Sequence, residues 1–151
     1  MNTAKSTALL AAAVAAVLST AALADPEPRR YCSDSLVRGT YGIQMQGTRP
    51  VPGDPEGKVE AVIGVVVRHY DGQGNVTQID NIKGAVTGIV PNRLGTGTYK
   101  VNDDCSVAIE FRPGPNQLLR EQAVITEEGK ELRSITVFPP GVMVTATHRR
   151  I

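Results

Sequence analysis

The sequence predicts an all-β protein, and three observations support this fold class. From residue 36 onward the chain consists of short segments rich in β-branched residues, and Gly, Pro, Asn and Asp interrupt them repeatedly. No segment there keeps the apolar period of about 3.6 residues that is typical of a helix facing a core. Several segments instead alternate apolar and polar residues, which is typical of strands with one buried face. We therefore predict, in residues 36–151, an antiparallel meander of about eight strands closed into a barrel, with a two-sheet sandwich as the alternative.

Residues 1–24 have the composition of an export signal. Lys5 is the only charged residue there, an apolar run of about ten residues follows it, and the segment ends in Ala22-Leu23-Ala24. A membrane span needs about 20 apolar residues, so this run is too short. We predict cleavage near Ala24, export to the periplasm or the medium, and no membrane anchor; a buried Ala-rich helix is the alternative. Residues 25–35 form a proline-spaced, charged arm that cannot start a helix or a central strand.

The first predicted strand spans residues 36–46, where Tyr41, Ile43 and Met45 share one face. Residues 49–57 hold three prolines and two glycines, which do not support ladder hydrogen bonds, so we predict a loop that is either a lid over a barrel mouth or an ordinary connection. The segments that follow give eight or nine strands in all, joined mostly by tight turns. In chain order they are strand 59–70, turn 71–74, strands 75–83, 84–90 and 97–101, turn 102–104, strand 106–112, turn 113–116, strand 118–126, turn 127–130, strand 131–138, turn 139–141 and strand 142–149.

Composition excludes several classes of function. The chain has 16 Lys and Arg against 15 Asp and Glu, and because Lys5 lies in the predicted signal, the exported part has no formal net charge. Without a basic surface and without tryptophan for stacking, nucleic-acid binding is not expected. The two cysteines, Cys32 and Cys105, predict one disulfide in an oxidising compartment. Two cysteines without a neighbouring histidine pair do not form the usual zinc site, and we predict neither a metal nor a cofactor.

The apolar rows of the strands predict a barrel interior. An eight-stranded barrel is just wide enough to be filled by its own side chains or to admit one small ligand. We predict a lumen that binds a small apolar ligand, with small residues such as Gly64 and Ala146 leaving room for it. The residues predicted to line the lumen are Ile43, Met45, Ile63, Val65, Val67, Ile125 and Val144.

Common catalytic signatures, such as Gly-x-Ser-x-Gly, His-Glu-x-x-His and Cys-x-x-Cys, are absent from the sequence. Three residues are weak candidates for proton transfer. His69 and His148 share strand parity with apolar rows and lie at strand ends, where a structural rim position is the favoured interpretation. For Glu121 an exposed position is favoured. If its row is the inner one, the carboxylate needs a partner such as Arg112 or Arg133, and burial would then raise its pKa.

Four stretches are familiar when taken together: GTYGIQMQGT at 39–48, YDGQGNVT at 70–77, GTGTYKVN at 95–102 and VMVTAT at 142–147. They resemble a group of small exported bacterial proteins of unknown function, over most of the chain after the predicted signal. More remotely, the order of strands is similar to the allene oxide cyclase-like barrels, which include cyclases, dirigent proteins and pocket proteins. This second resemblance implies an eight-stranded barrel, a lumen for an apolar small molecule and frequent oligomerisation. No cyclase catalytic residue matches a position here.

Three functions remain open from the sequence. Binding of a small apolar ligand in the lumen is favoured. A structural or interaction protein that uses its outer faces, including a homo-oligomer, is second, and a contiguous exposed apolar patch would support it. An isomerase or cyclase of an apolar substrate is third, and it requires His69, His148 or Glu121 inside the cavity with a hydrogen-bond partner.

Overall fold

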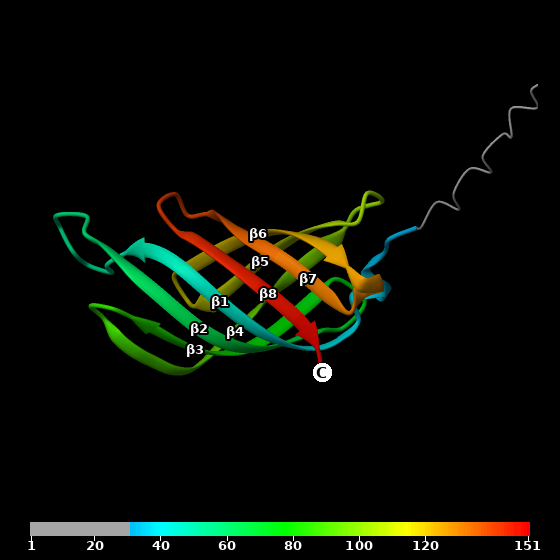
Figure 1. Ribbon diagram of the computed structural model, residues 1–151, viewed down its shortest axis with the longest axis horizontal. Coiled ribbons are helices and arrows are strands. Elements are labelled where there is room, and N and C mark those ends of the chain that lie inside the picture. The colour runs from blue at the N-terminus through cyan, green and yellow to red at the C-terminus, as the bar shows by residue number, and fades with distance from the viewer. Residues whose placement is uncertain (1–30) are drawn as a thin grey trace, which may run out of the picture.

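The structure is a computed structural model that describes residues 31–151 (Figure 1). The predicted signal peptide and residues 25–30 of the predicted arm lie outside the described residues. Eight antiparallel strands follow one another around a closed barrel, and β1 pairs with β8 to complete it. The predicted barrel is confirmed. The strands are β1 (Gly39–Pro50), β2 (Val59–Tyr70), β3 (Asn75–Gly84), β4 (Gly88–Val101), β5 (Ser106–Gly114), β6 (Gln117–Thr126), β7 (Glu131–Phe138) and β8 (Met143–Arg150).

Helical structure in the described residues is limited to two short 3-10 turns, η1 (Asp34–Val37) and η2 (Glu127–Gly129). Within residues 31–151, no helix combines the length and the hydropathy that crossing a membrane requires.

The predicted strand 84–90 is only partly correct, because Gly84 ends β3 and residues 85–87 form the turn. Residues 88–90 and the predicted strand 97–101 belong to one strand, β4, so the barrel has eight strands rather than nine. Its pairing with β3 continues past Pro91 and Asn92, with a shift of register between Asp80 and Ile82. Asn92 has a φ of 51°, and its N–H donates to Asn81 Oδ1 at 3.2 Å instead of joining the ladder. A bulge at this point accommodates the proline, because no ladder hydrogen bond is required of it there.

The barrel end against which η1 lies, at the right of Figure 1, is filled by tyrosines. Tyr41, Tyr70 and Tyr99 are buried and pack edge to face, with neighbouring ring centroids 5.3 and 5.0 Å apart. The Tyr99 hydroxyl donates to the Asp34 carbonyl of η1 at 3.0 Å, and the Tyr41 hydroxyl donates to the Gly129 carbonyl of η2. Both 3-10 turns are thereby held against the tyrosines, and this end of the barrel is closed.

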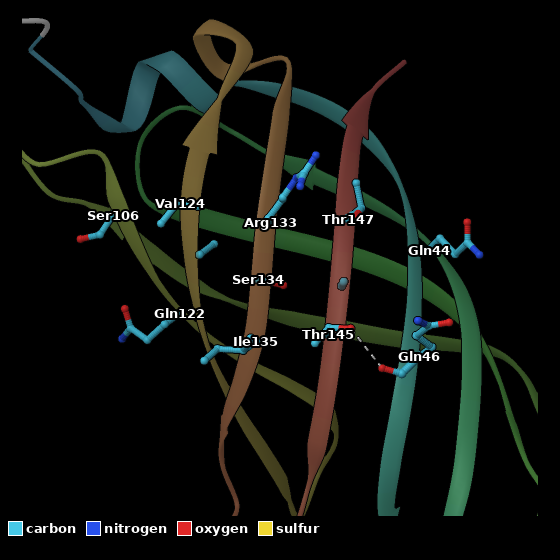
Figure 2. Close-up of a pocket in the computed structure, with 12 residues that line it drawn as sticks. Gln44, Gln46, Ser106, Gln122, Val124, Arg133, Ser134, Ile135, Thr145 and Thr147 are labelled. Atoms are coloured by element: carbon cyan, nitrogen blue, oxygen red, sulfur yellow. Dashed lines mark hydrogen bonds between the residues drawn. The ribbon is translucent and has the colours of Figure 1, made fainter.

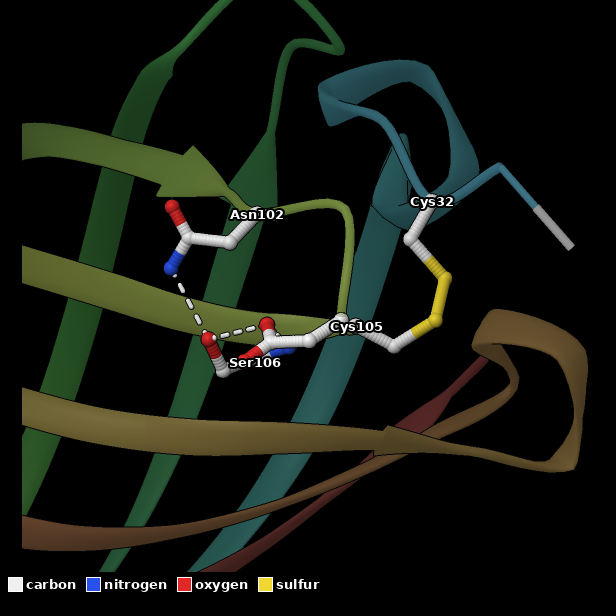
Figure 3. Close-up of a disulfide and its surroundings, with 5 residues drawn as sticks. Cys32, Asn102, Cys105 and Ser106 are labelled. Carbon is white, nitrogen blue, oxygen red and sulfur yellow. Dashed lines mark hydrogen bonds between the residues drawn. A yellow bond between two sulfur atoms is a disulfide. The ribbon is translucent and has the colours of Figure 1, made fainter. Parts of the chain in front are cut away.

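The predicted disulfide between Cys32 and Cys105 is present, with Cα atoms 5.1 Å apart and a sequence separation of 73 (Figure 3). It joins the segment before η1 to the turn between β4 and β5. The Asp34 carboxylate adds a second link, since its Oδ1 accepts a hydrogen bond from the Val101 N–H at 2.7 Å. The chain from Cys32 onward is therefore fastened to the closed end.

Strand register decides which residues face the lumen. On β1, Tyr41 and Ile43 are buried, as predicted. On β2 the prediction is wrong: Ile63, Val65 and Val67 are 59, 60 and 52% exposed and lie on the outside of the barrel. Directly paired residues of neighbouring strands lie on the same face of a sheet. Because Ile43 pairs with Val66 and Tyr41 with Arg68, the alternate row of β2 faces inward.

The error on β2 has a simple physical reason. Most of this strand is apolar on both faces, so alternation does not identify its inner row. The true inner row also carries Glu60 and Arg68, and charged residues usually mark the solvent side. Here they are buried because the lumen supplies partners for them.

Candidate functional site

The lumen contains a cavity of about 560 Å³ that opens at the end opposite the tyrosines. This volume lies within the range of about 300 to 1,000 Å³ that is typical of small-molecule sites. The connections β1–β2, β5–β6 and β7–β8 form its mouth, through residues such as Pro52, Asn116 and Pro139. Pro50 and Pro52 of the predicted loop 49–57 thus border the opening.

The walls of the cavity are largely apolar. Of the predicted lining residues, Ile43, Met45 and Val144 line it, whereas Ile125 is half-buried and packs against the core instead. Ala146 borders the cavity, as predicted. A Cβ at Gly64 would meet the Ile82 side chain, so the space beside that glycine is already filled. Further apolar lining comes from Val62, Val66, Ile82, Phe111, Leu119 and Val142.

A buried ion pair lies among these apolar walls. Arg68 and Glu121 are only 2 and 8% exposed, and the guanidinium contacts both carboxylate oxygens, at 2.9 and 3.1 Å. The exposed position favoured for Glu121 is therefore wrong, because the row of β6 that includes it is the inner one. Its partner is Arg68 of β2, not Arg112 or Arg133, whose side chains are exposed. The guanidinium also lies over the Phe111 ring, 4.8 Å from its centroid.

Polar side chains continue from this ion pair across β3 and β4. Gln78 accepts a hydrogen bond from Arg68 Nε at 2.8 Å and donates to Asp80 Oδ2 at 2.9 Å. Arg93, closer to solvent, donates to both oxygens of Asp80 at 2.9 and 3.1 Å. We call Arg68, Gln78, Asp80 and Arg93 the polar wall of the lumen. It faces a cavity whose other sides are mainly apolar.

A third buried carboxylate, Glu60, lies near the mouth and pairs with Arg49 at 2.9 Å. Hydrogen bonds from the backbone N–H groups of Thr87 and Val86, together with the Thr87 hydroxyl and Arg49, outweigh burial and lower the pKa of Glu60 to about 2. This carboxylate holds the turn between β3 and β4 in place.

His148 lies inside the barrel, fully buried, between two hydroxyl groups. Tyr70 Oη is 3.2 Å from Nδ1, and Ser134 Oγ is 3.0 Å from Nε2. The directions of these hydrogen bonds follow from Arg68, which can only donate and which donates to Tyr70 Oη at 3.3 Å. The Tyr70 proton then points to Nδ1, Nε2 carries the imidazole proton and donates to Ser134, and the Ser134 hydroxyl donates to Glu121.

Protonation states agree with this arrangement. Burial, with repulsion from Arg68, lowers the pKa of His148 to about 3, so the ring is neutral. Burial raises the pKa of Tyr70 to about 12, so its hydroxyl keeps its proton. Burial also raises the pKa of Glu121, but attraction and hydrogen bonds from Arg68 prevail and hold it below its usual range. Both nitrogens of His148 are hydrogen-bonded and both oxygens of Glu121 accept from Arg68, so proton exchange with a bound molecule would first have to break these hydrogen bonds.

His69, the other histidine candidate, lies on the outside of the barrel. Its Nδ1 is 3.1 Å from the Thr40 hydroxyl on β1. His69 lies outside the barrel and His148 inside it, so the two do not form the pair at one barrel mouth that the sequence left open. Within the described residues, no group of three or more His, Cys, Asp or Glu side chains is placed to hold a metal ion.

The polar wall was not identified from the sequence, although a signal for it was present. Gln78 and Asp80 share strand parity with Val76 and Ile82, which are buried, so period-two reading of β3 places all four on one face. What the pattern does not provide is a reason for polar residues to be inside. That reason is Arg68, a partner on another strand.

A second hollow, of about 720 Å³, lies on the outer face of β6, β7, β8 and β1 (Figure 2). Gln44, Gln122 and Arg133 extend outward from the sheet there, and the Thr145 hydroxyl donates to the Gln46 carbonyl at 3.5 Å. Ser134 instead points through the sheet toward His148. The polar side chains that border this outer hollow point away from the sheet and do not enclose a space for a ligand, so the lumen is the better candidate site.

Comparisons of the chain with protein-family models, with curated proteins and with solved structures found no match.

Proposed function

We propose that this protein is an exported barrel that binds a small, mainly apolar molecule in its lumen. The observation that carries the proposal is the cavity of about 560 Å³, which is closed at the tyrosine end, open at the other and walled mostly by apolar side chains. Burying an apolar molecule there releases about 25 cal/mol per Å² of apolar surface removed from water. Export is supported by the Cys32–Cys105 disulfide and by the composition of residues 1–24.

Binding is favoured over catalysis because the titratable groups inside the lumen are already committed to one another. His148 and Glu121 are both inside with hydrogen-bond partners, which is the arrangement that an isomerase would need. Those partners, however, occupy both nitrogens of the histidine and both oxygens of the carboxylate, so proton transfer to or from a bound molecule would first have to break them. The network therefore serves to hold the lumen in shape rather than to move protons.

Titration of the purified protein with the neutral lipophilic dye N-phenylnaphthylamine tests the proposal. We expect a saturable rise in fluorescence. Ala146→Phe fills the lumen and should abolish the rise, whereas Thr145→Phe, one residue away on the outer face of β8, should leave it unchanged. Dye binding that is absent, or that persists in Ala146→Phe with the same affinity, would contradict lumen binding.

A second candidate function is association with another copy of the chain through the outer face of β2, β3 and β4. Val67, Ile79 and Leu94 lie side by side across these strands and are 52, 46 and 70% exposed. Soluble proteins ordinarily expose single apolar residues scattered over the surface, whereas these three are neighbours and form a continuous apolar row. Sedimentation velocity tests it: a dimer or larger species that Ile79→Glu dissociates supports association, and a monomer at all concentrations contradicts it.

A further inference from the structure

The charged groups of the lumen are paired one to one. Three arginines line the cavity, and each contacts a buried carboxylate at 2.9 Å. The pairs are Arg49 with Glu60, Arg68 with Glu121, and Arg93 with Asp80. Among the described residues, the lumen thus offers no unpaired charge. An anion or a cation entering it would lose hydration without gaining a counterion, which is strongly unfavourable.

Hydrogen-bond donors remain available on the polar wall. A guanidinium has five N–H groups, and within the described residues Arg68 uses four of them and Arg93 three. The Gln78 amide donates one of its two N–H groups, to Asp80. All three side chains line the cavity, so a bound molecule would lie next to groups that each carry a spare N–H.

The carboxylate acceptors, and the hydroxyl protons of the network around His148, are more fully used. Glu121 accepts twice from Arg68 and once from Ser134, and Asp80 accepts twice from Arg93 and once from Gln78. The protons of Tyr70 and Ser134 are committed within the ring of hydrogen bonds around His148. A bound molecule therefore meets donors without a partner, and it gains most by bringing an acceptor to them.

We propose that the molecule bound in the lumen is neutral and apolar and carries a carbonyl-type acceptor, as a ketone, ester or amide does, directed at the spare N–H groups of Arg68, Gln78 and Arg93. This inference rests on the proposed function and adds the chemical class of the ligand. A carbonyl oxygen accepts hydrogen bonds without needing a counterion, and its apolar chain lies against Ile43, Val66 and the rest of the apolar walls.

A panel of matched compounds tests the proposal by displacement of N-phenylnaphthylamine from the purified protein. The panel is methyl decyl ketone, dodecane and laurate. We expect the ketone to bind about tenfold more tightly than dodecane, since a hydrogen bond to a charged donor is worth roughly that factor. We expect laurate to bind more weakly than the ketone at neutral pH, because its charge has no partner in the lumen.

Infrared spectroscopy gives a second, independent readout. The carbonyl stretch of isotope-labelled methyl decyl ketone should shift to lower frequency in the complex than in hydrocarbon solvent. The double variant Arg68→Met with Glu121→Leu removes a charge pair as a unit; it should reduce both the shift and the preference for the ketone, with Thr145→Phe unchanged as the control.

The outcomes separate the two proposals. Absence of dye binding, or dye binding insensitive to Ala146→Phe, overturns lumen binding itself. Dye binding that Ala146→Phe blocks, with a ketone no better than dodecane or no carbonyl shift, overturns only the carbonyl proposal. Preferred binding of laurate overturns the requirement for a neutral molecule.

Discussion

At the scale of single residues, Arg68 links more of the lumen than any other side chain described above. It pairs with Glu121, donates to Gln78 and Tyr70, and lies over Phe111. A buried ion pair of this kind contributes little net stability by comparison with apolar residues of the same volume, because the pair must be desolvated. Removing only one partner of the pair destabilises the fold far more, because the remaining charge stays buried without a counterion.

This asymmetry predicts the outcome of a double-mutant cycle. Arg68→Met should lower the free energy of unfolding by about 3 to 5 kcal/mol, because it leaves the Glu121 carboxylate without its counterion. Arg68→Met with Glu121→Leu should lower it much less than the single change. Urea denaturation of the four proteins in the cycle measures both quantities. Equal losses in the single and double variants would show that the ion pair is not coupled as the structure indicates.

His148 predicts a pH dependence of stability. Its pKa is about 3 in the folded protein, where burial and then Arg68 lower it and Glu121 partly opposes them, and about 6.5 in the unfolded chain. Below about 6.5 the unfolded state binds the proton and the folded state does not, so stability is lost as the pH falls. Between about pH 7.5 and about pH 5 this residue should remove about 2 kcal/mol from the free energy of unfolding.

His148→Gln is the matched control for that titration. Its amide retains an acceptor for Tyr70 and a donor for Ser134 but does not titrate. The loss of stability between about pH 7.5 and about pH 5 should be about 2 kcal/mol smaller in the variant, and His69, present in both proteins, cancels from the comparison. The same slope in both proteins would mean that His148 is protonated in the folded state.

At the scale of elements, the sequence predicted strands well where turn residues delimit them. Strand 59–70 has the predicted bounds because prolines and glycines precede it and the Asp71 turn follows, with the Asp71 carboxylate bonded to the N–H groups of Gln73 and Asn75. Pro91 misled the prediction for β4, because a bulge tolerates a proline that a regular ladder excludes.

The site was less predictable than the strands for a different reason. Whether Glu121 or Arg68 faces inward depends on a partner that lies 53 residues away in sequence. Alternation gives the two faces of a strand but not which face is inside when both are apolar, as on β2, or when the inner face is partly polar, as on β3. Only strand register, which is a property of pairs, decides between them.

The disulfide acts at this scale as well, because it fastens the segment before η1 to the turn between β4 and β5. On the chain-entropy argument, closing a loop of 73 residues stabilises the fold by about 4 kcal/mol. Cys32→Ser with Cys105→Ser should therefore lower the free energy of unfolding by about 2 to 4 kcal/mol. Urea denaturation with and without a reducing agent measures it. The reductant should destabilise the original protein to the level of the serine variant and leave that variant unchanged; any effect on the variant would contradict this account.

At the scale of the whole molecule, the barrel has two unlike ends. The tyrosines, both 3-10 turns and the disulfide all gather at one end, so packing and covalent closure are concentrated there. The cavity and the proline-bordered loop lie at the other end. The stabilising contacts and the cavity thus lie apart, and a molecule that filled the cavity would add contacts at the open end.

This division predicts that lumen binding stabilises the entire fold. A compound that binds only the folded barrel, supplied at 100 times its dissociation constant, raises the free energy of unfolding by about 2.7 kcal/mol. Thermal denaturation with methyl decyl ketone at that excess should show the increment in the original protein and in Thr145→Phe. In Ala146→Phe the increment should vanish, because the phenylalanine occupies the space that the ketone would fill. An equal increment in all three proteins would place the bound compound outside the lumen, on the outer faces of the strands.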